Sequence, residues 1–143
     1  MATVRTAEAH WEGSLKEGQG EVELVSSGVG SFEVSWPARA EQANGKTSPE
    51  ELIAAAHSTC FSMSLSLGLA NAGTPPTSID TRADVTFQPG AGITGIKLSV
   101  SGVVPGIDAA AFEAAAQDAK QNCPVSQALT GTTITLEVTG FGE

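Results

Sequence analysis

One apolar segment near the middle of the chain constrains the fold more than any other feature. Ser48-Pro49-Glu50-Glu51 begins it with a helix-start signal, in which Ser48 is the N-cap, a proline follows, and Glu51 completes a capping box. The segment continues to about Ala70 with only small polar side chains, and Asn71-Ala72-Gly73 ends it. A helix this long and this apolar is predicted to lie buried at the centre of the fold.

Helical spacing also predicts which side chains this helix buries. The positions that recur at this spacing are Leu52, Ile53, Ala56, Cys60, Met63 and Leu67. Phe61 is a further predicted core residue. Some of these side chains are also candidates to line an apolar pocket.

Strands are predicted on both sides of the helix. Alternating side chains predict a hairpin at about 4–11 and 20–26, a third strand at 31–36, two long strands at about 78–88 and 93–103, and a last strand at 132–138. Residues 37–47 are expected to be irregular. Two further helices are predicted at 109–120, capped by Asp108, and from Pro124 to about Leu129. Strands grouped apart from helices predict an α+β domain with antiparallel sheet.

Length and charge narrow the possible functions. The chain has 143 residues, so residues 1–143 are expected to form a single domain. Its net charge of −9 and its seven scattered Lys and Arg residues offer no basic patch for a nucleic acid. No apolar run reaches the length of about 18 residues that suggests a membrane span, and the N-terminus lacks a signal core, so we expect a cytoplasmic protein with neither membrane nor nucleic-acid partners.

The chain has only two cysteines, Cys60 within the apolar helix and Cys123 before the proline that begins the last helix. A free cysteine is most often a buried apolar side chain. Cys123, however, lies at a helix start, where unpaired amides favour a thiolate. Arg39 is a candidate cation for lowering the pKa of Cys60, and Glu50, about 15 Å before Cys60 along the helix axis, is placed to orient it. Arg82 is the competing cation, although strand alternation turns it toward solvent.

Two thiols of this kind suit peroxide chemistry. A thiolate attacks a peroxide oxygen, a fixed guanidinium stabilises the departing alkoxide, and the resulting sulfenic acid condenses with a second thiol. Spacing alone does not bring the two sulfurs together, because 63 residues separate them in the chain. The absence of Cys-x-x-Cys and of His/Cys clusters makes a structural zinc site improbable.

Several segments together resemble the OsmC/Ohr family of organic hydroperoxide peroxidases, in particular its osmotically inducible OsmC subgroup. They are His10-Trp11-Glu12-Gly13, Ser48 to Leu67 with its Ala-Ala-His-Ser-Thr-Cys-Phe-Ser-Met block, Thr77 to Val85, Pro105-Gly106-Ile107-Asp108 and Cys123-Pro124-Val125-Ser126-Gln127. They span nearly the whole chain in order. Ser48 stands where the family commonly has Asn, and both are good N-caps.

The resemblance implies the chemistry and the assembly. Cys60 would be the peroxidatic cysteine and Cys123 the resolving one, with Arg39 activating the thiolate and Glu50 orienting Arg39. The implied fold is OsmC-like, with antiparallel sheets around a long central helix in an intertwined homodimer. The implied reaction reduces organic hydroperoxides in oxidative or osmotic stress without a cofactor or metal. An external dithiol, dihydrolipoamide on a lipoylated protein, would then reduce the Cys60–Cys123 disulfide.

Two other functions stay open at this level. A non-enzymatic stress-associated binding protein would keep both thiols buried, and a thiol–disulfide exchange protein would act on other proteins, although the Cys-x-x-Cys motif usual for exchange is missing. His57 is interpreted chiefly as a packing residue, with a catalytic role as the minor alternative, and Ser126 as a polar group at a helix start. With two histidines and no nucleophile elbow, hydrolase chemistry is improbable.

Overall fold

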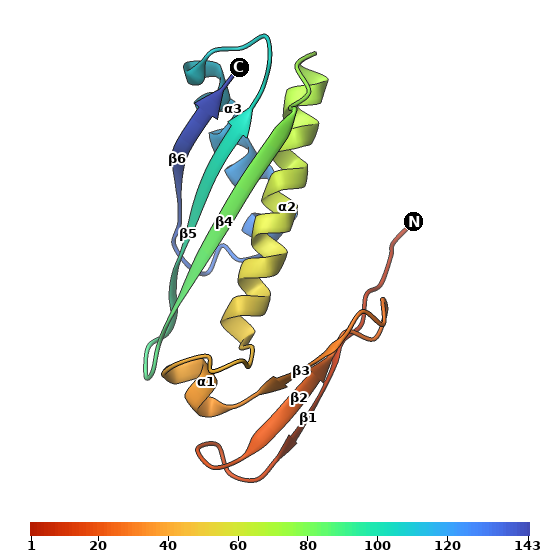
Figure 1. The fold of residues 1–143 in the computed structure, drawn as a ribbon, viewed down its shortest axis with the longest axis vertical. Helices are drawn as coiled ribbons and strands as arrows, with labels where there is room; N and C mark the ends of the chain where they lie inside the picture. Colours follow the sequence, from red (N-terminus) through yellow and green to blue (C-terminus); the bar gives the residue numbers. More distant parts are fainter. The chain divides into compact units, whose positions relative to one another are not determined.

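The computed structural model describes residues 1–143, and the chain divides into two compact units, Met1–Leu52 and Ile53–Glu143. The order of elements is three strands, two helices, two strands, two helices and a last strand (Figure 1). Each unit has its own three-stranded sheet, so the α+β class expected from the sequence is confirmed. The units are described here one at a time.

The first unit holds an antiparallel sheet of short strands. These are β1 (Glu8–Glu12), β2 (Gln19–Glu23) and β3 (Ser31–Val34), in the order β1-β2-β3. The predicted hairpin and third strand are confirmed with narrower bounds. A Cβ on Gly20 would lie 2.7 Å from the Trp11 ring, so only glycine lets the indole pack this closely across the hairpin.

The segment after β3 is helical where an irregular stretch was expected. Helix α1 (Trp36–Ala40) begins at Ser35, whose hydroxyl accepts a hydrogen bond from the Ala38 amide, and a proline lies in its first turn. These are ordinary helix-start signals. The prediction of an irregular stretch was therefore wrong for this part, and Arg39 lies in the last turn of a short helix.

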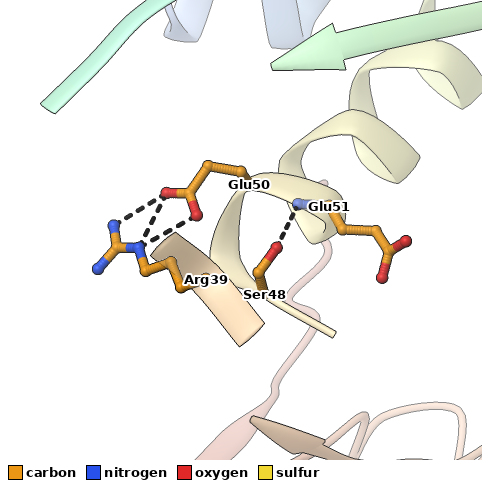
Figure 2. Close-up of polar contacts among 4 residues, drawn as sticks. All are labelled: Arg39, Ser48, Glu50 and Glu51. Atoms are coloured by element: carbon orange, nitrogen blue, oxygen red, sulfur yellow. Dashed lines mark hydrogen bonds and ion pairs between the residues drawn. The ribbon is translucent and has the colours of Figure 1, made fainter. Parts of the chain in front are cut away.

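Helix α2 (Pro49–Asn71) has the ends that its sequence predicts. The Ser48 hydroxyl accepts from the Glu51 amide (Figure 2). The Glu51 carboxylate accepts from the Thr47 hydroxyl, outside the expected capping box. At the other end, Gly73 has a φ of +87°, and the amides of Gly73 and Thr74 donate to Ala70 and Leu69. This Schellman motif needs a left-handed residue, which glycine supplies without strain.

The second unit holds a mixed sheet rather than the antiparallel one that was expected. Strands β4 (Ser78–Gln88) and β5 (Gly92–Val103) form the predicted antiparallel pair, but β6 (Ile134–Gly142) pairs with β5 in parallel. The reason is the connection, because helices α3 (Ala109–Asn122) and α4 (Pro124–Ala128) carry the chain back before β6 begins. The Asp108 carboxylate caps α3 as predicted.

The core of this unit joins one face of α2 to β5 and α3. Its fully buried members include Phe61, Leu65, Leu98, Val100, Phe112 and Cys123. A Cβ on Gly102 would lie 2.8 Å from the Phe112 ring, so β5 needs a glycine where α3 crosses it. The Phe112 and Phe141 rings pack with their centroids 5.2 Å apart.

The outer face of α2 departs from the sequence prediction. Within the single chain Met63 is 69% exposed and Leu67 62% exposed, while the buried face is built from His57, Phe61, Leu65 and Leu69. Because α2 is apolar nearly all round, its periodicity could not select a face. The predicted core positions Ala56, Met63 and Leu67 were wrong for the isolated chain. By length and composition α2 would also suffice to cross a membrane, although core helices pass the same test.

Candidate active site

Arg39 and Glu50 form a closely fitted ion pair within the first unit. Arg39 Nε lies 3.1 Å and 3.2 Å from the two carboxylate oxygens of Glu50, and Arg39 Nη2 lies 2.9 Å from Oε2 (Figure 2). The Glu50 side chain is 7% exposed and that of Arg39 is 32% exposed. A bidentate carboxylate fixes both the position and the plane of a guanidinium. Glu50 thus holds Arg39 in one orientation, with part of the Arg39 side chain open to solvent.

Cys60 and Cys123 meet in the second unit. Their side chains lie near enough for each to shift the pKa of the other, and both thiols are free. Cys60 is half-buried on α2, whereas Cys123 is fully buried at the residue that joins α3 to α4. The fold therefore brings together two thiols that lie 63 residues apart in the chain.

The surroundings of the two sulfurs differ. Burial raises the pKa of the Cys60 thiol, and its hydrogen bond to Cys123 raises it further. Burial also opposes ionisation of Cys123, but hydrogen bonds from the Ser126 amide, the Cys60 thiol and the Ser126 hydroxyl outweigh it and lower the pKa of Cys123. These surroundings favour the thiol form of Cys60 and the thiolate form of Cys123.

Cys60 opens into an apolar groove. The groove has a volume of about 760 Å³, and its lining includes Met63, Leu67, Ala115 and Pro124. Cys123 is not among the lining residues, consistent with its full burial. A reagent that enters the groove would thus meet Cys60 first.

A second polar pair lies close to the thiols in sequence. His57 Nε2 lies 2.7 Å from Ser126 Oγ, and both side chains are buried. The His57 Nδ1 atom has no hydrogen-bond partner. Burial lowers the pKa of His57, which favours the neutral imidazole. The sequence signal for this pair was its spacing, because His57 precedes Cys60 by three residues and Ser126 follows Cys123 by three.

The remaining candidate groups lie elsewhere. Arg82 is 77% exposed and pairs with Asp84 at 2.9 Å, so the prediction that it faces solvent is confirmed. The hydrogen-bonded Asp84 carboxylate raises the pKa of Arg82, and the Arg82 guanidinium lowers the pKa of Asp84. No group of three or more His, Cys, Asp or Glu side chains is arranged to hold a metal ion.

Known proteins that are similar to this chain belong to one family. The family model for OsmC-like proteins matches residues 42–139. Peroxiredoxin OsmC of Escherichia coli K12 is 48% identical over 132 residues, which cover 90% of this chain and 92% of the relative. An organic hydroperoxide resistance protein from Elizabethkingia anophelis is 27% identical with a TM-score of 0.67, and covers all of both chains. An OsmC-like protein from Mycoplasma pneumoniae, 14% identical, shares the fold with a TM-score of 0.72 over 99% of each chain.

An α+β fold that brings two free thiols close together defines a thiol-based redox protein. The chain belongs to the OsmC family. With relatives named as peroxiredoxins, it is a cysteine-based peroxidase.

Proposed function

We propose that the chain reduces organic hydroperoxides to alcohols by a cycle through Cys60 and Cys123. The observation that carries the proposal is the proximity of the two free thiols, with Cys60 lining the groove and Cys123 buried. A sulfenic acid formed on Cys60 would have its condensing thiol already in contact. A binding protein with purely structural thiols would need neither the contact nor the access.

The cycle balances in three steps. The Cys60 thiolate attacks the terminal peroxide oxygen, the O–O bond breaks, and the alkoxide takes a proton to leave as an alcohol. The Cys123 thiolate then attacks the sulfur of the Cys60 sulfenic acid, and hydroxide leaves as water after taking a proton. An external dithiol finally reduces the Cys60–Cys123 disulfide by two thiol–disulfide exchanges.

Arg39 supplies the charge that this cycle needs at Cys60. The surroundings of Cys60 in its own unit raise its pKa, so attack at neutral pH requires a cation near that sulfur. We assign this role to Arg39, because Glu50 fixes its guanidinium and leaves it partly open. The same guanidinium would stabilise the departing alkoxide.

The groove and the free thiols support the remaining assignments. An apolar lining favours alkyl or lipid hydroperoxides over hydrogen peroxide. Both cysteines must be returned to free thiols in each cycle, which suits the reducing cytoplasm. We propose a lipoylated protein as the source of the reducing dithiol. We propose a role in oxidative and osmotic stress, without nucleic-acid or membrane partners.

The test is one equivalent of cumene hydroperoxide added to the fully reduced protein, followed by thiol counting and intact mass. We expect both thiols to disappear with a mass loss of about two hydrogens and no added oxygen. Unchanged thiols would contradict the peroxidase cycle and favour structural cysteines. Reduction of insulin disulfides by the reduced protein would favour thiol–disulfide exchange instead.

A homodimer is the second part of the proposal. Met63 and Leu67 form an exposed apolar ridge on α2 that borders two grooves, and a second copy of the chain would cover it. We expect the protein to sediment as a dimer and Leu67→Glu to sediment as a monomer, because a carboxylate buried without a partner is costly. Gln88→Glu, at an exposed end of β4, is the charge-matched control and should stay dimeric. A monomeric parent contradicts this assignment.

A further inference from the structure

The buried His57–Ser126 pair has no part in the cycle described above, yet it adjoins the cysteine that is hardest to reach. Ser126 lies on α4, three residues after Cys123, and its hydroxyl and backbone amide are among the groups that lower the pKa of Cys123. The same hydroxyl oxygen lies 2.7 Å from His57 Nε2 on α2, and His57, Ser126 and Cys123 are all buried. One buried hydroxyl thus contacts the imidazole and also acts on the thiol that serves as the partner of Cys60.

Counting protons sets the direction of these hydrogen bonds. A serine hydroxyl has one hydrogen to donate, so it can serve either the histidine or the sulfur. If it served His57, then His57 would carry its proton on Nδ1, a buried atom without a partner. A buried N–H group that lacks an acceptor is rarer in proteins, and costs more free energy, than a buried nitrogen lone pair that lacks a donor. The arrangement that avoids it has His57 Nε2–H donating to Ser126, and Ser126 donating to Cys123.

We infer that His57 and Ser126 are positioning residues that stabilise the Cys123 thiolate, with His57 held as the neutral Nε2–H tautomer and the Ser126 hydroxyl aimed at the sulfur. The inference rests on the proposed function, because it serves Cys123 as the resolving cysteine. The lowered pKa of His57 agrees with a neutral ring, which carries one proton and so can leave Nδ1 unprotonated while Nε2 donates. Three titratable groups take part, namely His57, Cys60 and Cys123.

The thiolate of Cys123 acts twice in the cycle. It is the nucleophile that attacks the Cys60 sulfenic acid, and it is the leaving group when the disulfide is reduced. Because Cys60 borders the groove and Cys123 is buried, the thiolate of an external dithiol attacks the Cys60 sulfur. The S–S bond breaks, its electron pair leaves on Cys123, and the second thiol then releases Cys60 from the mixed disulfide. A leaving thiol of lower pKa departs faster.

The first experiment measures the pKa of Cys123 by thiolate absorbance in a Cys60→Ser background, where it is the only thiol. Adding Ser126→Ala should raise the pKa of Cys123, because a hydrogen bond to a charged group is lost. At pH values below the pKa of Cys123, the thiolate fraction should fall by about tenfold. His57→Leu should also raise the pKa, whereas His57→Gln, which keeps an N–H donor, should partly restore it. Ser62→Ala removes a hydroxyl that bonds Thr81, away from the sulfurs, and should cause no shift.

An unchanged pKa in folded Ser126→Ala overturns the inference. Nitrogen NMR of His57 in the unsubstituted protein decides the matter even where a variant fails to fold. A neutral Nε2–H tautomer supports the inference, and a proton on Nδ1 overturns it. Neither readout requires peroxide turnover, so failure of this inference is distinct from failure of the peroxidase cycle. In the two-cysteine protein, reduction of the disulfide by dithiothreitol should slow by about tenfold in Ser126→Ala and not in Ser62→Ala.

Discussion

Cys60→Ser is expected to lower organic hydroperoxide turnover by about a thousandfold or more, because serine at its ordinary pKa cannot replace a thiolate nucleophile. Cys123→Ser should act differently. Its Cys60 would still react once, but the sulfenic acid would then lack the thiol that lies in contact with it. We therefore expect one equivalent of alcohol per chain and a mass gain of about one oxygen on Cys60.

The measurement is alcohol release followed in single and multiple turnover, with intact mass recorded at each stage. Ser62→Ala is a suitable control, because it removes a side-chain hydrogen bond of α2 without changing either thiol. Multiple turnover in Cys60→Ser would contradict the mechanism. Full multiple turnover in Cys123→Ser would mean that an external thiol resolves the sulfenic acid directly.

Arg39→Met is expected to have the second largest effect. We propose that this fixed cation stabilises both the thiolate and the departing alkoxide, so its removal should slow the first oxidation step by about 100-fold to 1,000-fold. The substitution also leaves the Glu50 carboxylate buried without its partner, so the free energy of unfolding should fall by about 3 kcal/mol near neutral pH. Both effects come from one side chain and can be measured separately.

Stopped-flow oxidation with cumene hydroperoxide reports the rate, and urea unfolding reports the stability. The matched control is Arg82→Met, because Arg82 makes a similar ion pair with Asp84 but is largely exposed. Water screens an exposed ion pair, so Arg82→Met should change little. Equal loss of activity in the two variants would refute the assignment of Arg39 as the activating cation.

Local signals in the sequence predicted most of the helices and strands. The ends of α2 follow from Ser48 and Gly73, and the start of α3 follows from Asp108, because caps depend on neighbours within a few residues. The β4–β5 pair follows from alternation on both sides of a short turn. Helix α1 also had such a signal at Ser35 and a following proline, which the prediction passed over.

Features that depend on distant parts of the chain were not predictable in the same way. The parallel pairing of β6 depends on where α3 and α4 return the chain, which strand alternation does not report. The exposed ridge of Met63 and Leu67 could not be foreseen, because a helix that is apolar on every side has no periodicity to select its buried face.

The sequence by itself determined which groups are available to the candidate site. They are two thiols, the Glu50 carboxylate at the start of the apolar helix, and a small set of cations. Only the tertiary structure decided which of them meet. It joined Arg39 to Glu50, Cys60 to Cys123, and His57 to Ser126, the last across 69 residues of chain. The physical reason is that hydrogen bonds and pKa values depend on contact and burial, and packing between distant segments creates both.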